Sequence, residues 1–182
     1  MSRSRYPARQ RVSYGFPPVA MPCATVLVLG SLPGVKSINA CEYYANPRNA
    51  FWQIAEQHLG ILPQAYAARV KKVTTRGVAL WDVLAAATRS DSLDSAIEED
   101  AVPNNFRALL HAYPTIQMIC FNGAKACQLF SLFSVLTLTE QQKRIQRLTL
   151  PSTSGAHAKM SLREKAKAWE IVWKWRSAQL TR

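Results

Sequence analysis

An uninterrupted apolar run near the N-terminus limits the possible folds of this chain more than any other feature. Residues 25–30 read Thr-Val-Leu-Val-Leu-Gly and include no charged side chain. A strand with one face in water would alternate polar and apolar residues, so this run predicts a strand that is buried on both faces. Such strands occur in parallel sheets covered by helices on either side, and the sequence therefore favours an α/β fold.

The rest of the sequence supplies the strands and helices that such a sheet requires. Strands are also predicted at residues 77–82, 115–121 and 145–150. Helices are predicted at residues 49–59, 64–75, 103–112 (with Pro103 in the first turn), 124–133, and from Ser161, where Glu164 completes a capping box. With no internal repeat or linker, we predict one domain over residues 21–182, a three-layer α/β/α sandwich around a four-stranded parallel sheet.

Charge points to the kind of partner. The 182 residues carry a net charge of +12, although only 19% of them are charged, so acidic residues are scarce. This balance favours a basic face on a folded domain, with nucleic acid as partner. Residues 1–20 are expected to form a basic, disordered N-terminal arm before the domain, of which residues 1–10 are rich in arginine. No apolar run is long enough to cross a bilayer, so we expect a cytoplasmic protein without membrane association.

The four cysteines, Cys23, Cys41, Cys120 and Cys127, include no Cys-x-x-Cys pair. Their spacing fits neither a zinc site nor an iron–sulfur cluster, so reduced thiols and no bound metal are expected. Cys120 and Cys127 lie in apolar stretches and are predicted to be core residues.

Three segments carry the polar groups that chemistry would need. Ligands of parallel α/β sheets bind at the carboxyl ends of the strands, which directs attention to the loops at residues 31–49, 82–87, 122–125 and 151–159. The first of the three segments is Gly30-Ser-Leu-Pro-Gly34, at the start of the first loop. It predicts a tight turn with accessible backbone N–H groups, although such a sequence can also be a turn without a binding role.

The second segment, residues 43–52, reads Tyr-Tyr-Ala-Asn-Pro-Arg-Asn-Ala-Phe-Trp. Tyrosine offers a ring on which a base can stack, asparagine offers uncharged donors and acceptors, and Arg48 can meet a phosphate. Phe51 and Trp52 are equally suited to the core, and we assign Trp52 there. Asn49 could instead cap a helix, and the residues alone leave that alternative open.

The third segment, residues 150–158, reads Leu-Pro-Ser-Thr-Ser-Gly-Ala-His-Ala. Small hydroxyl residues and a glycine would let the backbone approach DNA and bind phosphate oxygens. Without the other two segments, a flexible polar loop would explain this sequence equally well.

Taken together, the segments resemble the uracil-DNA glycosylase superfamily, and within it the hypoxanthine-DNA glycosylases. That family shows Gly-Ser-x-Pro-Gly, Tyr-Tyr-x-x-Pro-x-Asn-x-Phe-Trp, Leu-Trp-Asp and Leu-Pro-Ser-Thr-Ser, which here are residues 30–34, 43–52, 80–82 and 150–154. The resemblance runs from about Val26 to the last helix. It implies a monofunctional DNA glycosylase that excises a deaminated base, hypoxanthine by preference, from double-stranded DNA in base-excision repair.

Two departures from the superfamily pattern affect the implied mechanism. Most branches carry an acid or amide in the first turn and a His or Asn before Pro-Ser, but here those positions are Ser31, Leu32 and Leu150. The resemblance therefore places catalysis on Asn49, which would orient water because a neutral amide is a poor base. His157 is an electrophile by residue type, but the family does not fix histidine at that position.

The resemblance also implies roles for the remaining site residues. The base would be flipped out of the duplex, stacked on Tyr44 and cleaved through an oxocarbenium-like sugar, leaving an abasic site. A monomer that needs no cofactor or metal and associates with a bacterial nucleoid is expected. Base-binding residues would be Gly30, Ser31, Leu32, Pro33, Gly34, Tyr44 and Asn122, and DNA-binding residues would be Arg48, Lys125, Ser152, Thr153, Ser154, Gly155, Ala156 and His157.

Other functions remain open at this point. Uracil or G:U/G:T mismatch activity suits the same residues. A non-catalytic nucleic-acid-binding module would explain Leu32 and Leu150. A small-molecule phosphate enzyme is disfavoured, because the glycine fingerprint of dinucleotide sites and the acid that comes after it are missing.

Overall fold

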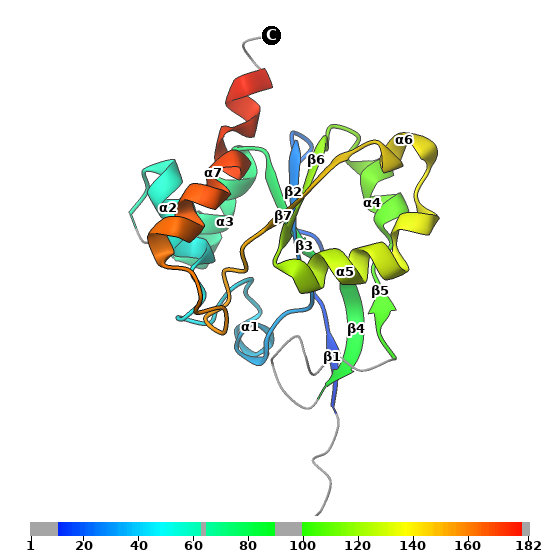
Figure 1. Ribbon diagram of the computed structural model, residues 1–182, viewed down its shortest axis with the longest axis horizontal. Coiled ribbons are helices and arrows are strands. Elements are labelled where there is room, and N and C mark those ends of the chain that lie inside the picture. The colour runs from blue at the N-terminus through cyan, green and yellow to red at the C-terminus, as the bar shows by residue number, and fades with distance from the viewer. Residues whose placement is uncertain (1–10, 63–64, 90–99, 180–182) are drawn as a thin grey trace, which may run out of the picture.

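The computed structural model describes residues 11–62, 65–89 and 100–179, so residues 1–10 of the predicted basic arm lie outside it. Its centre is a four-stranded parallel sheet in the order β3 (Val78–Asp82), β2 (Val26–Gly30), β6 (Met118–Asn122), β7 (Gln146–Leu150). Helices cover both faces of this sheet (Figure 1). The predicted three-layer α/β/α sandwich is confirmed, and all four predicted strands are present.

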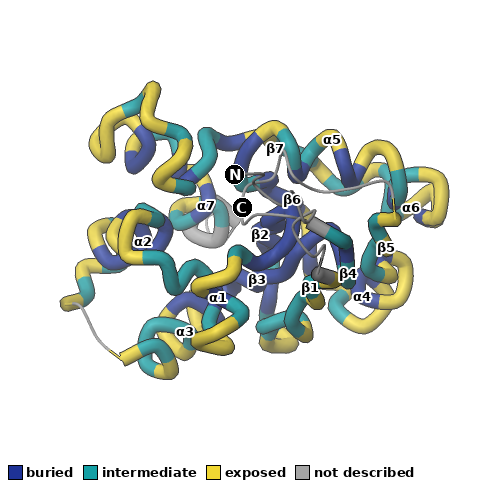
Figure 2. Tube along the Cα trace, turned by 90° about the horizontal axis from the view of Figure 1, so that it is seen from below, coloured by how far each residue is buried: buried dark blue, intermediate teal, exposed yellow. Residues whose placement is uncertain are grey.

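Alternate side chains of each strand build two separate cores. In β2, Leu27 and Leu29 pack toward α4 (Phe106–Ala112) and α5 (Ala124–Phe133). Val26 and Val28 pack on the other face, against α2 (Phe51–Leu59), α3 (Tyr66–Thr75) and α7 (Leu162–Gln179). Figure 2 shows the middle of the parallel sheet as the buried centre, with most exposed residues on the outer sides of the helices and in loops.

Helix α7 begins and packs as its sequence predicts. Ser161 N–H donates to the Glu164 carboxylate at 2.8 Å, and Glu164 N–H donates to Ser161 Oγ at 3.3 Å, which confirms the capping box. Ala166, Trp169 and Val172 are buried against α2 and the sheet. This packing holds the loop between β7 and α7 at the carboxyl end of the sheet.

A second, antiparallel sheet was not predicted. It pairs β1 (Arg11–Tyr14), β4 (Leu84–Arg89) and β5 (Val102–Pro103) in the order β1-β4-β5. Residues 11–20 therefore belong to the domain and not to an N-terminal arm, because β1 pairs with β4 and the Phe16 carbonyl accepts from Trp81 Nε1 at 2.9 Å.

Two further predictions near this sheet were wrong. Residues 82–87, expected to be a loop, lie largely in strand β4. Pro103 lies in β5 and not in the first turn of a helix, since α4 begins at Phe106. The N-cap residue of α4 is Asn105, whose Oδ1 accepts from Ala108 N–H at 3.0 Å.

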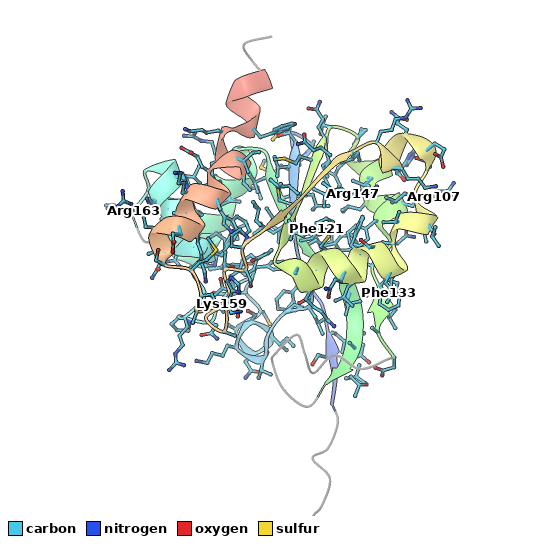
Figure 3. The ribbon with its side chains drawn as sticks, in the orientation of Figure 1. Arg107, Phe121, Phe133, Arg147, Lys159 and Arg163 are labelled. Carbon is cyan, nitrogen blue, oxygen red and sulfur yellow. The ribbon has the colours of Figure 1, made fainter. Side chains whose placement is uncertain are left out.

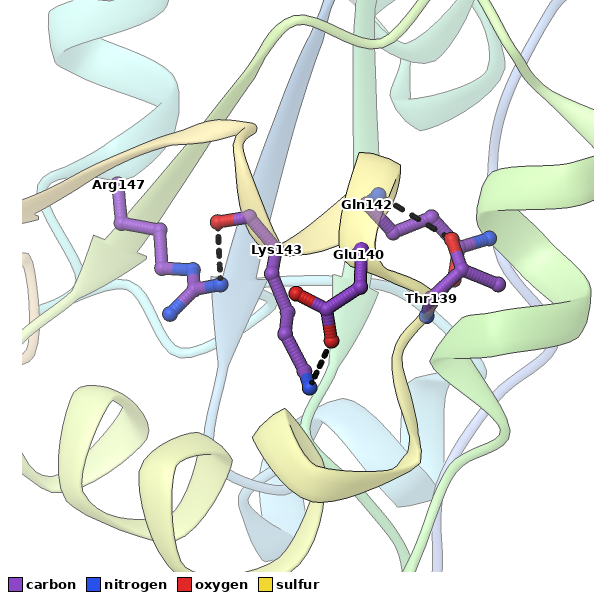
Figure 4. Close-up of polar contacts among 5 residues, drawn as sticks. All are labelled: Thr139, Glu140, Gln142, Lys143 and Arg147. Carbon is purple, nitrogen blue, oxygen red and sulfur yellow. Dashed lines mark hydrogen bonds and ion pairs between the residues drawn. The ribbon is translucent and has the colours of Figure 1, made fainter.

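Short helices complete the fold: α1 (Val35–Ala40), η2 (Val135–Thr137) and α6 (Glu140–Lys143). Thr139 and Gln142 form a capping box at α6, and Arg147 on β7 donates to the Lys143 carbonyl at 3.0 Å (Figure 4). These contacts join α6 to the edge strand of the sheet. Within the described ranges, no helix is long and apolar enough to cross a membrane.

The four cysteines are free thiols. Cys120 is buried in β6, and its burial raises the pKa of the thiol to about 12. Cys127 is only half-buried and packs against the core on the α4 and α5 side, so the predicted core position is confirmed for Cys120 and not for Cys127.

Candidate active site

The carboxyl ends of the parallel strands border a cavity of about 680 Å³. Its walls come from the turn after β2, the segment that precedes α2, the ends of β3 and β6, and the loop after β7. Of the site residues predicted from the sequence, the structure brings the following together in the lining: Gly30, Ser31, Leu32, Pro33, Gly34, Tyr44, Arg48, Asn49, Asn122, Lys125, Ser152, Ser154, Gly155, Ala156 and His157.

The turn after β2 is held by β3 and by the two residues that come directly after that strand. Val83 N–H donates to the Gly30 carbonyl at 2.8 Å, and Leu84 N–H donates to the Ser31 carbonyl at 3.0 Å. A Cβ atom on Gly30 would lie 2.4 Å from Asp82 Oδ1, so a side chain at this position would displace the carboxylate. Glycine is therefore required here for close packing of two adjacent strands.

Asn49 both precedes helix α2 and lines the cavity, so the two alternatives that the sequence left open are compatible. Its Oδ1 accepts from Phe51 N–H at 3.0 Å, which satisfies one free donor at the start of the helix. Within the described part of the chain, its Nδ2 group donates no hydrogen bond. Asn49 is thus held by its oxygen, with its amide N–H groups left for a ligand.

Tyr44 is positioned by an unusual backbone and an aromatic neighbour. Its φ angle of 58° is left-handed, and its ring stacks on Phe51 with centroids 4.1 Å apart. Phe51 therefore covers one face of the ring, and a base could stack only on the other face.

The Tyr44 hydroxyl is buried and makes no hydrogen bond of normal geometry with the described residues. Burial raises the pKa of Tyr44 well above its usual range, the Asp82 carboxylate raises it further, and the nearby Asn122 side chain partly offsets this. The hydroxyl is consequently a neutral donor at physiological pH.

Asn122, at the end of β6, connects the sheet to the loop after β7. Its Nδ2 donates to Thr153 Oγ1 and its Oδ1 accepts from Thr153 N–H, each at 2.8 Å. The Thr153 carbonyl in turn accepts from Ala50 N–H at 2.8 Å. Thr153 is fully buried and outside the cavity lining, so we reassign it from DNA contact to anchoring the loop.

The loop after β7 also packs directly on the segment before α2. A Cβ on Gly155 would lie 2.7 Å from Arg48 Cβ and 2.9 Å from the Arg48 carbonyl oxygen. Only a residue without a side chain allows this approach. The two segments singled out in the sequence therefore form one continuous wall of the cavity.

Asp82 is a further candidate site residue, one that the sequence analysis missed. It lies at the end of β3, is only 3% exposed, and is the one acidic residue among the described residues that line the cavity. Its carboxylate contributes to the raised pKa of both Tyr43 and Tyr44. The signal was available, because an acid at the carboxyl end of a buried parallel strand must emerge at the ligand-binding edge.

The other charged side chains of the cavity lining are basic. It includes Lys36 on α1, Arg48 and Lys125, of which Lys36 was missed because α1 was not predicted. Lys159, labelled in Figure 3, lies in the exposed loop that precedes α7 at the same end of the molecule. No three His, Cys, Asp or Glu side chains among the described residues gather to hold a metal ion.

Comparison with known proteins settles which family has this arrangement. A family profile described as the uracil DNA glycosylase superfamily matches residues 17–174. The chain belongs to the uracil DNA glycosylase superfamily. The match starts before β2 and ends within α7, so it includes every segment that lines the cavity.

Individual members of the superfamily support this assignment. A hypoxanthine DNA glycosylase of Methanosarcina acetivorans is 33% identical over 90% of this chain and 99% of its own length. A hypoxanthine DNA glycosylase of Methanosarcina barkeri is 32% identical over 88% of this chain and 97% of its own length. The solution NMR structure of a candidate uracil DNA glycosylase from M. acetivorans superposes with a TM-score of 0.75 at 32% identity, covering 92% of this chain and 99% of that one.

The polar groups of the cavity are unevenly distributed among its walls. The first turn contributes Ser31 and Leu32, both buried, and neither is an acid or an amide. Other polar groups of the cavity include those of Asn49, Tyr44 and the adjacent strand end at Asp82.

Proposed function

We propose that this superfamily member is a monofunctional DNA glycosylase that removes hypoxanthine from double-stranded DNA. The observation that carries the proposal is the convergence of an amide, a buried carboxylate and a buried tyrosine hydroxyl on one cavity beside a loop suited to phosphate. The names of the two Methanosarcina relatives support hypoxanthine as the substrate.

The buried donor and acceptor suit the edge of a deaminated base. Hypoxanthine presents an oxygen acceptor at position 6 and an N–H donor at position 1, whereas adenine presents the reverse pattern. The neutral hydroxyl of Tyr44 can donate to the oxygen, and the carboxylate of Asp82 can accept from the N–H. Adenine would place a donor against the hydroxyl donor and an acceptor against the carboxylate, and such a mismatch in a buried site costs more than a missing contact on the surface.

Cleavage requires the base to leave the duplex and enter the cavity. The loop at residues 152–157 would press on the backbone, while Arg48 and Lys125 contact phosphates. Asn49 would hold a water molecule through its amide N–H groups. As the bond from C1′ to the base nitrogen breaks, the water oxygen bonds to C1′, and the proton that the water gives up passes to the departing base, which leaves a free base and an abasic site.

Stabilisation of the positively charged sugar would come from DNA phosphates and from the buried Asp82 carboxylate. No side chain amine serves as a Schiff-base nucleophile in this scheme, so the strand stays intact after base removal. We expect the protein to act as a monomer on chromosomal DNA, in the cytoplasm at the nucleoid. Light scattering of the purified protein, alone and with duplex, tests the monomer.

A panel of duplexes tests the proposal. Matched oligonucleotides carry inosine, uracil, xanthine, thymine opposite guanine, or adenine, and alkali reveals abasic sites. We expect cleavage of the inosine duplex and none of the adenine control. Cleavage of uracil in preference to inosine would favour the second candidate, a uracil or mismatch glycosylase, because uracil presents the same donor and acceptor pattern. Salt-sensitive binding without any product would indicate a non-catalytic nucleic-acid-binding module.

A further inference from the structure

A buried lysine lies directly beneath the loop between β7 and α7. Lys165 is the fourth residue of α7 and is only 5% exposed. Its Nζ donates to the His157 carbonyl at 2.8 Å and to the Ser154 carbonyl at 3.4 Å. One ammonium group thus holds both ends of the four-residue stretch 154–157, which lines the cavity.

Among the described residues, no carboxylate forms an ion pair with this ammonium. The ion pairs found there join Arg69 to Glu56, Lys143 to Glu140 and Lys174 to Glu170. The adjacent Glu164 is exposed and is used to cap Ser161. Burial lowers the pKa of Lys165, and the N-terminal end of a helix adds unfavourable positive potential.

A buried charge without an opposite charge nearby is unfavourable, so a purely structural explanation of Lys165 is unsatisfactory. A second contact from α7 already holds the loop, since Trp169 Nε1 donates to the Pro151 carbonyl at 2.9 Å. Negative charge above the loop would compensate the ammonium. A DNA phosphate lying on residues 154–157 would supply it.

We propose that Lys165 is a positioning residue for DNA, which fixes the loop 154–157 from below and whose charge is balanced when a phosphate binds above that loop. The carbonyls of Ser154 and His157 are drawn inward by the ammonium, and the outer surface of the loop is left for the phosphate. The inference rests on the proposed DNA glycosylase function, but it concerns a residue outside the cavity lining.

The test compares Lys165→Met with Lys167→Met, which removes an exposed charge from the same helix. Three quantities are measured: the melting temperature, the affinity for a duplex with a stable abasic-site analogue, and the single-turnover rate on an inosine duplex. We expect Lys165→Met to bind the abasic-analogue duplex with an affinity lower by roughly tenfold or more, and to cleave the inosine duplex at a rate reduced by a similar factor. A loss of this size is typical when a charged hydrogen bond is removed. Its melting temperature should be equal to or above that of the wild type, because an uncompensated buried charge is removed. Lys167→Met should cleave at the wild-type rate.

Several outcomes decide against the proposal. It is overturned if Lys165→Met binds and cleaves like the wild type, or if Lys167→Met loses as much. It is also overturned if Lys165→Met loses activity together with a melting temperature below that of the wild type, because that result indicates a merely structural role. Should Lys165→Met not fold, Lys165→Gln keeps a hydrogen-bond donor without the charge, and wild-type behaviour of that variant counts against the proposal. If the wild type cleaves no duplex, the proposed function fails, while affinity for the abasic analogue still tests Lys165.

Discussion

Substitution of Asn49 separates its helix-capping role from its proposed catalytic role. Because Asn49 Oδ1 accepts from Phe51 N–H at 3.0 Å, Asn49→Ala removes a cap as well as an amide. Loss of such a cap costs about 1 kcal/mol, which lowers the melting temperature by roughly 2–4 °C in a chain of this size. Asn49→Ser keeps a capping oxygen, so its stability should match that of the wild type.

Catalysis should respond differently from stability. If the Asn49 amide orients water, both variants lose a preorganised group, which typically costs roughly 100- to 1,000-fold in rate, or about 2.7–4 kcal/mol. Binding of undamaged duplex should persist in both variants, because its affinity comes from phosphate contacts elsewhere. Asn49→Ser is thus the decisive variant, since it is expected to be fully stable and nearly inactive.

The assay is single-turnover cleavage of a labelled inosine duplex under saturating enzyme, with alkali to reveal abasic sites. Thermal unfolding and duplex binding by fluorescence anisotropy accompany each variant. A wild-type cleavage rate in Asn49→Ser would refute the assignment and leave Asn49 as a helix cap. A rate loss confined to Asn49→Ala, in proportion to its lower stability, would lead to the same conclusion.

Other side chains of the site give predictions of their own. Asp82→Leu should lower kcat/KM for inosine roughly 10- to 150-fold through loss of a charged hydrogen bond, and unchanged kinetics on the duplex panel would exclude the carboxylate from base reading. Tyr44→Phe keeps the stack on Phe51, so it should reduce kcat/KM only about 2- to 13-fold, as for a neutral hydrogen bond, and a larger loss would indicate a different role. Because the folded-state pKa values of Tyr43 and Tyr44 are raised, their contribution to stability is complete below pH 10 and decreases as the pH rises above it; urea unfolding should show this decrease, less steeply in Tyr44→Phe. Gly155→Ala should lower stability by about 1–3 kcal/mol, since its Cβ would lie 2.7 Å from Arg48 Cβ, and an unchanged melting temperature would show that the two segments separate easily.

The parallel sheet could be predicted because its strands carry their own signal. Residues 26–30 and 78–82 are buried at every position, and such runs have few alternatives to a two-faced strand. The small sheet could not be found in this way. Strand β4 reads Leu-Ala-Ala-Ala-Thr-Arg, and its partner β1 lies about 70 residues earlier, so only the tertiary pairing makes either one a strand.

The site was predicted unevenly for a similar reason. Residues 30–34, 43–52 and 152–157 were found as segments with unusual composition, and the fold brings them to one cavity. Asp82 and Lys165 were missed because neither stands out by composition: Asp82 ends an apolar strand, and Lys165 is one of several charged residues of α7. Their significance comes from burial, which the sequence of either element does not reveal.

The contacts around Thr153 bear on the proposed catalytic role of Asn49, an amide that lies in the segment before α2. Asn122 holds Thr153 by two hydrogen bonds, and the Thr153 carbonyl accepts from Ala50, the residue next to Asn49. Gly155 packs on Arg48 from the same loop. The loop that would receive the DNA backbone and the residue that would hold the water are therefore parts of one rigid unit. Because a catalytic group needs its position fixed to within a fraction of an ångström, such attachment supports the proposal that Asn49 is the catalytic amide, although it does not belong to the turn after β2.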